Sequence, residues 1–327
     1  MPELRKDPIV GRWVIIATER ARRPGNVVDQ SRNVFSQAPQ LCVLQEGDKV
    51  ILKTDHVRVV SHRAPLLNPD HKLKRSGKGF YDVVSGYGAH EVVIETPDPI
   101  ANMADLSVEQ ISHAITAYAS RMNDLKKDPN IEYILVYKTY DNRGAVEARQ
   151  SYAQILASPV LPLHIKEKLT GAKWYYKFHE RCIYSDIAKQ EEETKKRVVI
   201  DNEHFLVIMP FASRFPFETW VIPKKQHCDF AEGVAGNEKH LAATLKDLLT
   251  RIKVGLDDPA YTFVINSAPV HSDGGSAWKT IRDDFCWHIE VTPQLTRVAG
   301  FEKGSGFYIC PIPPEDTAEF LRTAETQ

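Results

Sequence analysis

Residues 127–136 read Lys-Asp-Pro-Asn-Ile-Glu-Tyr-Ile-Leu-Val, and residues 257–265 read Asp-Asp-Pro-Ala-Tyr-Thr-Phe-Val-Ile. Each stretch passes from an Asp-Pro step into β-branched and aromatic residues, which favour a strand. The two Asp-Pro steps start at residues 128 and 258, an offset of 130 residues. A repeat this long that occurs only twice indicates one fold that has been duplicated, rather than a solenoid.

An amphipathic helix is expected before each of these stretches. Apolar residues recur on one face of residues 107–125, and Ser107 with Gln110 matches a capping box at the start. In the second copy, apolar residues line one face of residues 238–254. The same order of elements therefore occurs in both halves of the chain.

Strands are expected over residues 90–96, 131–138 and 261–266, which are rich in β-branched and aromatic residues. They do not alternate with helices in the way that a parallel doubly wound sheet requires. The sequence therefore predicts an α+β fold of antiparallel sheets with packed helices. We place the first repeat at residues 1–176 and the second at residues 177–327.

The composition is that of an ordinary globular protein. Of 327 residues, 43% are hydrophobic and 26% are charged, and the net charge is -1. These values exclude disordered, collagen-like and coiled-coil classes and do not indicate an extended nucleic-acid surface. No membrane span or signal peptide is expected, and five scattered cysteines indicate reduced thiols in the cytoplasm. The charged run at residues 191–197 is interpreted as a solvated turn between strands.

Five motifs follow one another along nearly the whole chain. They are residues 4–24, which contain Gly-Arg-Trp-Val-Ile-Ile; residues 86–97, Gly-Tyr-Gly-Ala-His-Glu-Val-Val-Ile-Glu-Thr-Pro; residues 210–218, Pro-Phe-Ala-Ser-Arg-Phe-Pro-Phe-Glu; residues 287–290, Trp-His-Ile-Glu; and residues 299–306, Ala-Gly-Phe-Glu-Lys-Gly-Ser-Gly. Together they resemble the galactose-1-phosphate uridylyltransferase family, a branch of the histidine triad superfamily. The resemblance implies two histidine-triad-like repeats in one pseudo-symmetric chain, nucleotidyl transfer between phosphorylated acceptors, and a homodimer.

The nucleophile motif of that family is altered in this chain. Family members carry His-x-His-x-Gln, whose second histidine attacks the α-phosphorus of a nucleotide, a role that suits a neutral imidazole near pH 7. Residues 150–154 read Gln-Ser-Tyr-Ala-Gln instead. The resemblance therefore places Tyr152 at the nucleophile position and Gln154 at the glutamine that contacts the phosphates.

A second candidate comes from laying one repeat over the other. Residues 150–154 then fall opposite residues 286–290, and His288 is the histidine that remains in the two triad-like positions. His288 is a candidate catalytic residue beside Tyr152. The alternative is that His288 is a half-buried structural histidine whose ring bonds the backbone.

Further ligand contacts are implied by the same resemblance. Arg20 and Arg23 match basic residues that face the substrate phosphates, and guanidinium groups suit such oxygens because they offer paired charged donors. Surface arginines without that role are the alternative. Residues 299–302 match a strand that touches the hexose in sugar-using members, where Glu302 would accept hydroxyl hydrogen bonds. His90 is expected to pack at the start of its strand, and a contact with the ligand is the alternative.

Two other family features differ here. The Phe-x-Asn-x-Gly turn that helps to seat the nucleotide corresponds either to residues 137–141 or, with a gap, to residues 140–144. Many members also hold a structural zinc through two cysteines and two histidines. The four matching positions are Asn33, Ser36, Pro99 and Gln150, which supply neither thiolate nor imidazole. We therefore expect no zinc and no other cofactor.

Three functions stay open from the sequence alone. One is a divergent nucleotidyltransferase that uses Tyr152, His288 or direct transfer. The second is an inactive relative that binds a nucleotide or nucleotide-sugar as a sensor or partner subunit. The third is an enzyme of another reaction type in the same pocket, because a fold does not determine its chemistry. The expected partner is a nucleotide, nucleotide-sugar or phosphorylated small molecule, with no nucleic acid and no membrane.

Overall fold

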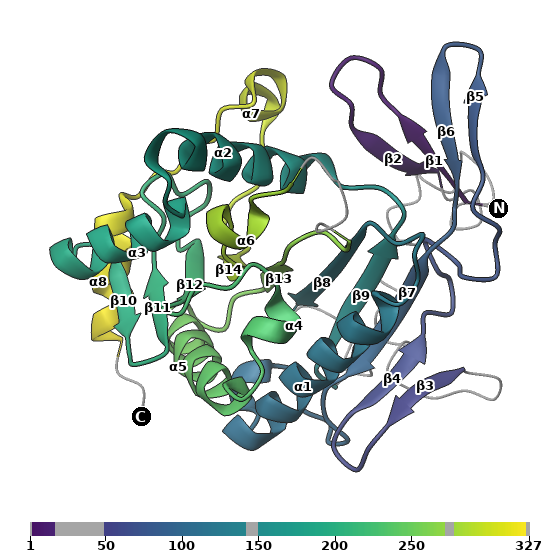
Figure 1. Ribbon diagram of the computed structural model, residues 1–327. Helices are drawn as coiled ribbons and strands as arrows, with labels where there is room; N and C mark the ends of the chain where they lie inside the picture. The colour runs from purple at the N-terminus through teal and green to yellow at the C-terminus, as the bar shows by residue number, and fades with distance from the viewer. Residues whose placement is uncertain (1, 17–48, 142–149, 272–277, 325–327) are drawn as a thin grey trace.

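Ten strands form one antiparallel sheet that organises the molecule (Figure 1). The computed structural model describes residues 2–16, 49–141, 150–271 and 278–324. In chain order the strands of this sheet are β3 (Val50–Lys53), β4 (Arg58–Ser61), β7 (Ala89–Ile94), β8 (Tyr133–Tyr140), β9 (Tyr152–Ser158), β10 (Val198–Asp201), β11 (Phe205–Ile208), β12 (Thr219–Pro223), β13 (Tyr261–Asn266) and β14 (His288–Pro293).

The two halves of this sheet have the same strand order. From the edge to the centre, the first half runs β3-β4-β7-β9-β8 and the second runs β10-β11-β12-β14-β13. The equivalent strands β8 and β13 pair at the centre, where Tyr140 lies opposite Tyr261. The two copies are thus joined edge to edge in one sheet rather than forming two separate sheets. The boundary placed after residue 176 falls inside helix α2 (Leu163–His179) and stays a prediction.

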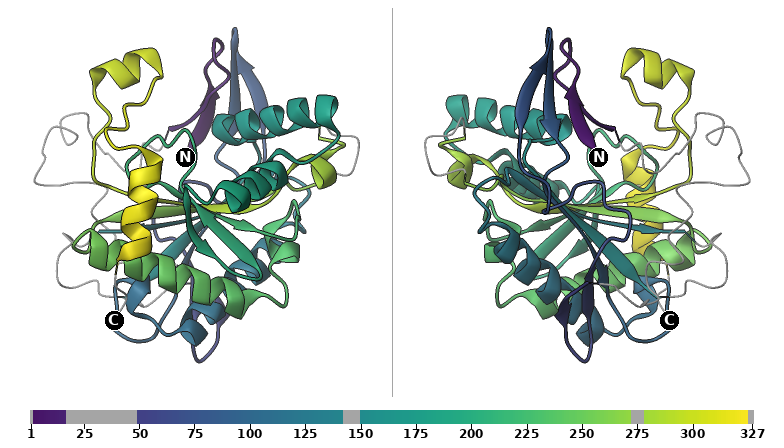
Figure 2. Two further views of the ribbon diagram at one scale, coloured as in Figure 1. Left: turned by 90° about the vertical axis from the view of Figure 1, so that its left-hand side faces the viewer. Right: turned by 90° about the vertical axis from the view of Figure 1, so that its right-hand side faces the viewer.

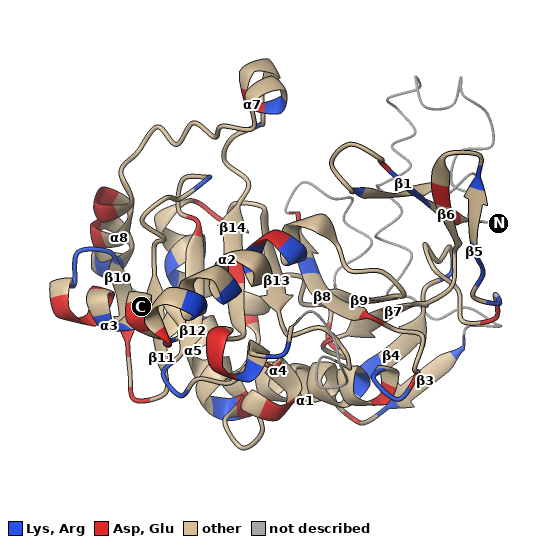
Figure 3. Cartoon of the chain, turned by 45° about the horizontal axis from the view of Figure 1, so that its top comes forward, with Lys and Arg blue, Asp and Glu red and all other residues tan. Residues whose placement is uncertain are grey.

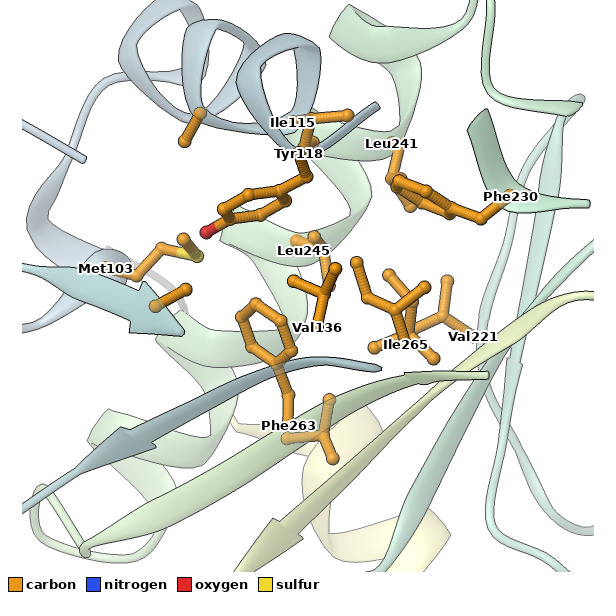
Figure 4. Packing of buried hydrophobic residues seen from close by; sticks show 14 of the residues in the cluster. Met103, Ile115, Tyr118, Val136, Val221, Phe230, Leu241, Leu245, Phe263 and Ile265 are labelled. Carbon is orange, nitrogen blue, oxygen red and sulfur yellow. The ribbon is translucent and has the colours of Figure 1, made fainter. Parts of the chain in front are cut away.

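Two long helices cover one face of the sheet. Helices α1 (Val108–Leu125) and α5 (Glu238–Gly255) lie side by side there, as Figures 1 and 2 show. Figure 4 shows Tyr118 of α1 and Leu245 of α5 pointing toward Phe263 of β13. Because this core takes side chains from both halves, the two repeats share one hydrophobic interior.

The start of α1 differs in one detail from the expected capping box. The Ser107 hydroxyl oxygen accepts a hydrogen bond from the Gln110 backbone N–H at 3.1 Å, as expected. The Gln110 side chain, however, donates to the carbonyl oxygens of His56 and Glu95 instead of accepting from Ser107. Only the serine half of the box forms, because these carbonyls take the glutamine amide.

The other face of the sheet is covered by helices over the second half. The helices α2, α3 (Ile183–Thr194) and α6 (Ile281–Asp284) contribute to a second core with Leu206 and Ile222. In the part of the chain that the structure describes, no helix packs on this face of β7 and β9 (Figures 1 and 2). We call this face of β7, β9 and β8 the open face because no described helix packs on it, although Val92 and Ile94 of β7 are buried there, with 0% and 1% of their surface exposed.

The remaining elements lie around the sheet. A four-stranded sheet of order β2-β1-β6-β5 stands beside the first half (Figure 1). The strands of this small sheet are β1 (Glu3–Lys6), β2 (Trp13–Ile16), β5 (Arg75–Lys78) and β6 (Tyr81–Ser85). The other elements are the 3-10 turn η3 (Met103–Asp105) and the helices α4 (Phe230–Gly233), α7 (Gly300–Ser305) and α8 (Pro314–Thr323). Among the described helices, none has both the length and the apolar character needed to cross a bilayer.

The charged run at residues 191–197 is not a solvated turn between strands. Its first residues end α3, and the Glu191 side chain is buried. The Arg197 guanidinium pairs with the Glu191 carboxylate at 2.6 Å and with Glu315 of α8 at 2.6 Å. The run therefore ties α3 to α8, and the interpretation from composition was wrong.

Candidate functional site

Tyr152 and Gln154 lie on the open face of β9. Successive side chains of a strand point to opposite faces, and Ala153 and Ile155 belong to the core beneath α1 and α5. Tyr152 packs beside Ile94 and Val92 of β7. The first repeat therefore presents the residues of the altered nucleophile motif on the face without helices.

The Gln154 side chain is oriented by two neighbouring strands. Its Oε1 atom lies 2.8 Å from Nε2 of His90 and accepts a hydrogen bond from the Tyr137 hydroxyl at 3.0 Å. The Leu66 backbone N–H donates to His90 Nδ1 at 3.2 Å, so the His90 partners require a neutral ring with its proton on Nε2. Because Oε1 is held in this way, the Gln154 amide offers its NH₂ group as the donor end. Phosphate oxygens are suitable acceptors for such a donor.

His90 does more than pack at the start of its strand. It is buried on β7, as expected, with 3% of its surface exposed, and its ring stacks on His62 with centroids 4.1 Å apart. Its hydrogen bond fixes which way the Gln154 amide faces. Sequence reasoning could have found this pair only from the register that places β7 beside β9.

A lysine that the sequence analysis missed lies on the opposite face of the sheet, behind Tyr152. Lys138 of β8 is 2% exposed, and its Nζ donates to Glu95 Oε2 at 2.6 Å and to Ser151 Oγ at 2.7 Å. The only sequence signal was a lysine at a position where Ile134 and Val136 predict a core-facing side chain. The start of β9 therefore rests on a buried charged group.

His288 is enclosed in the second half. Its ring is 0% exposed, lies against the Tyr184 ring of α3 with centroids 4.7 Å apart, and donates from Nδ1 to the Cys286 carbonyl oxygen at 3.0 Å. Burial lowers the pKa of His288, so the ring is neutral near pH 7. This arrangement favours the structural alternative for His288, and its catalytic role stays a prediction.

In the second half, the residue equivalent to Gln154 is held in salt bridges within the chain. Glu290 of β14 matches Gln154, and its carboxylate pairs with Lys168 at 2.6 Å and with Arg214 at 3.1 Å. Burial would raise the pKa of Glu290, but the charges of Lys168 and Arg214 outweigh burial and hold that pKa well below its usual range. The chain's own cations thus occupy this place, whereas the first half leaves Gln154 on the open face.

Glu302 is not brought together with Tyr152 and Gln154. It lies on α7, which is a helix and not the strand that the resemblance implied, and α7 stands away from β9 in Figures 1 and 3. Its carboxylate accepts hydrogen bonds from the backbone N–H groups of Ala299 at 2.7 Å and Ile309 at 3.2 Å. Within one chain Glu302 therefore holds its own segment in shape, and its hexose contact stays a prediction.

Several expectations fall on residues that the structure does not describe. Arg20 and Arg23 lie outside the described residues, and so do Asn33 and Ser36. For the family's nucleotide-seating turn, the ungapped match at residues 137–141 is described and contains Tyr137, which bonds Gln154. The gapped match at residues 140–144 extends past residue 141 and so lies partly outside the described residues.

The residues present do not fit the family's zinc. Pro99 has no side-chain donor atom, and the Gln150 side-chain amide donates to the Pro97 carbonyl oxygen at 2.8 Å. Among the described residues, no three His, Cys, Asp or Glu side chains form a group that could hold a metal ion. Tetrahedral zinc sites need thiolate or imidazole ligands, so we derive no step through a metal.

Comparisons with known proteins agree with this architecture. The model described as galactose-1-phosphate uridyl transferase, N-terminal domain, matches residues 59–162, and the model of the C-terminal domain matches residues 168–311. An ADP-glucose phosphorylase from Arabidopsis thaliana is 31% identical over 98% of this chain and 92% of its own length. The chain belongs to the galactose-1-phosphate uridylyltransferase family.

Other members of the family are similar over their whole lengths. A galactose-1-phosphate uridylyltransferase from Thermotoga maritima is 26% identical, with 100% of both chains covered. Among solved structures, an ADP-glucose phosphorylase from Arabidopsis thaliana with bound ADP-glucose has a TM-score of 0.74 at 28% identity and 100% coverage of both chains. A uridylyltransferase has a TM-score of 0.81 at 25% identity and 98% coverage of both chains. The resemblance and the fold class expected from the sequence are confirmed.

Proposed function

We propose that this chain binds a nucleotide or nucleotide-sugar on the open face, with the Gln154 amide donating to its phosphate oxygens. The observation that carries this proposal is the fixed Gln154 side chain, whose Oε1 is occupied by His90 and Tyr137. Glu290, the equivalent residue of the second half, is already paired with Lys168. This difference between the two halves supports one ligand site per chain. ADP-glucose is the first ligand to test, because it is bound in a solved relative.

Tyr152 determines how much transferase chemistry this site retains. In a double displacement the Tyr152 oxygen would form a bond to the α-phosphorus while the bond from that phosphorus to the leaving phosphate oxygen breaks. A phenol titrates near pH 10 in water, so only about one in a thousand is ionised at pH 7. We therefore propose ligand binding as the main property and nucleotidyl transfer through Tyr152 as a slow reaction.

The second candidate function is an inactive relative that binds the ligand as a sensor or partner subunit. The replacement of both motif histidines, at Gln150 and Tyr152, favours it. Intact-mass measurement after incubation with ADP-glucose separates the two functions. A covalent nucleotidyl adduct supports the transferase, whereas a rise in the thermal midpoint without adduct or turnover supports the binding protein.

Gln154→Ala is expected to weaken ADP-glucose binding by about 10- to 30-fold, because it removes a hydrogen bond to a charged group. Isothermal titration calorimetry at pH 7.5 measures the dissociation constant. Gln190→Ala, on the exposed side of α3, is the matched control and should bind as tightly as the unaltered protein. Equal affinities of the Gln154 variant and the unaltered protein would remove Gln154 from the site.

We also propose that the protein is a homodimer. The segment between β14 and α8 exposes several large apolar side chains, among them Phe301 at 60%, Phe307 at 69% and Ile309 at 58%. Apolar side chains gathered on a projecting segment indicate a protein interface. Light scattering in solution should give twice the mass of one chain, and a monomer mass would refute the dimer. A cytoplasmic location stays a prediction.

A further inference from the structure

The ammonium group of Lys138 is saturated by three oxygen acceptors. Besides Glu95 Oε2 at 2.6 Å and Ser151 Oγ at 2.7 Å, Nζ donates to the Tyr152 backbone carbonyl oxygen at 2.9 Å. An ammonium has three N–H donors, so each one has a partner. The last of these bonds joins the buried charge directly to the main chain of the residue at the nucleophile position.

Both oxygen atoms of the Glu95 carboxylate have hydrogen-bond partners as well. Its Oε2 atom also accepts from the Ser151 hydroxyl, and its Oε1 atom accepts from the Tyr118 hydroxyl of α1. Burial, with the neighbouring Glu95 carboxylate, raises the pKa of Tyr118, so this phenol keeps its proton and donates. The group therefore leaves no buried donor or acceptor of Lys138 or Glu95 without a partner.

This network lies out of reach of water. Side-chain exposure is 1% for Lys138 and 0% for Glu95. A buried ion pair is costly to desolvate, and it is retained without loss only where geometry and hydrogen bonding are complete. Removal of one partner leaves the other charge buried and unpaired. Substitution of either residue should therefore lower the free energy of unfolding.

The network holds the start of β9 against the segment that follows β7. The Ser151 backbone N–H donates to the Ile100 carbonyl at 2.6 Å, and the Glu95 N–H donates to the Ser151 carbonyl at 2.9 Å. The Gln150 amide adds its bond to the Pro97 carbonyl. Polar contacts thus join residues 95–100 to residues 150–152 at three points, Glu95, Pro97 and Ile100.

The same two segments carry the positions at which the family would bind a zinc, Pro99 and Gln150. We propose that the buried group of Lys138, Glu95 and Ser151, which we call the cationic staple, replaces a metal ion in fixing these segments and thereby positions the Tyr152 backbone. Lys138 is accordingly a positioning residue and does not touch the ligand. The staple itself does not depend on the proposed function, but its effect on ligand binding does.

A double-mutant cycle tests the staple in the full-length protein. The variants are Lys138→Met, Glu95→Gln and their combination, with the exposed Lys127→Met of the Lys127–Asp124 pair as a matched control. Each staple single variant should lower the thermal midpoint by about 5–10 °C, and the control by less than about 1 °C. The double variant should lose less than the sum of the single variants, because both charges leave together. EDTA should leave the midpoint of the unaltered protein unchanged.

Hydrogen exchange distinguishes positioning from general stabilisation. In the double variant, peptides that cover residues 150–156 should exchange at least about tenfold faster, while peptides from β13 and β14 should not change. ADP-glucose should bind the double variant at least about tenfold more weakly, although the double variant loses less stability than the two single variants together. If the single variants do not fold, the double variant alone carries this comparison with the unaltered protein.

Three results would overturn the staple: additive losses in the cycle, unchanged exchange at residues 150–156, or a lower midpoint in EDTA. A double variant with unaltered affinity for ADP-glucose would leave the staple without a positioning role and would overturn that part. If the unaltered protein binds no nucleotide at all, the proposed function fails. The double-mutant cycle and hydrogen exchange still show in that case whether the staple fixes the start of β9.

Discussion

Gly88→Ala should destabilise the fold by more than about 3 kcal/mol in the free energy of unfolding. The Gly88 φ is +138°, and a Cβ atom built there would lie 2.2 Å from the Ala157 carbonyl oxygen. That oxygen belongs to β9, which pairs with β7 in the register Ala89 to Ala157. The backbone cannot yield without separation of the two strands, and the His90 bond to Gln154 would be lost with it.

Urea denaturation measures the loss, and Gly171→Ala provides the matched control. Gly171 lies exposed within α2, and a Cβ atom there would meet nothing within 4 Å. The same substitution should therefore stabilise the protein by up to about 1 kcal/mol, because alanine favours a helix. Equal stabilities of the Gly88 variant and the unaltered protein would contradict the close approach of β7 and β9.

Tyr152→His should convert the protein into one that forms a covalent nucleotidyl adduct with ADP-glucose. With an ordinary pKa near 6.5, about nine in ten imidazoles are neutral at pH 7.5, whereas a phenol with a pKa near 10 is ionised about three times in a thousand. The population of competent nucleophile rises several-hundred-fold, and position 152 already faces the open side of β9 beside Gln154. Intact-mass spectrometry within minutes of mixing detects the adduct.

Two controls make this gain specific. Tyr152→Phe should bind ADP-glucose and form no adduct, because it lacks a nucleophilic atom. Tyr81→His, on an exposed position of β6, should also form none. Absence of an adduct in Tyr152→His, with binding retained, would show that position 152 does not face the α-phosphorus.

The sequence predicted the elements whose pattern is long and local. Residues 261–266 form β13 as expected, and the helix expected at residues 107–125 is α1 with Ser107 as its cap. Apolar periodicity over several helical turns or a full strand is a local signal, so it predicts such elements without knowledge of the tertiary contacts. The Gln110 side chain and the run at residues 191–197 were misjudged because their partners, His56 and Glu315, are distant in sequence.

The candidate site was predictable only in part for the same reason. Gln154 came from a motif, but His90 and Tyr137 reach it from neighbouring strands, and no spacing along the chain shows that. Lys138 could not be understood without Glu95, which lies 43 residues away in the sequence. His288 is enclosed because α3 covers it, and α3 was not expected at that place.

A crystal structure of the protein with ADP-glucose tests the central claim most directly. We expect electron density for the nucleotide on the open face of β7, β9 and β8, with a phosphate oxygen within hydrogen-bond distance of Gln154 Nε2. The Tyr152 side chain should face the α-phosphorus. Nucleotide bound elsewhere, for example over β14 beside Glu290, or a protein that stays unliganded at saturating ADP-glucose and UDP-glucose, would contradict the account.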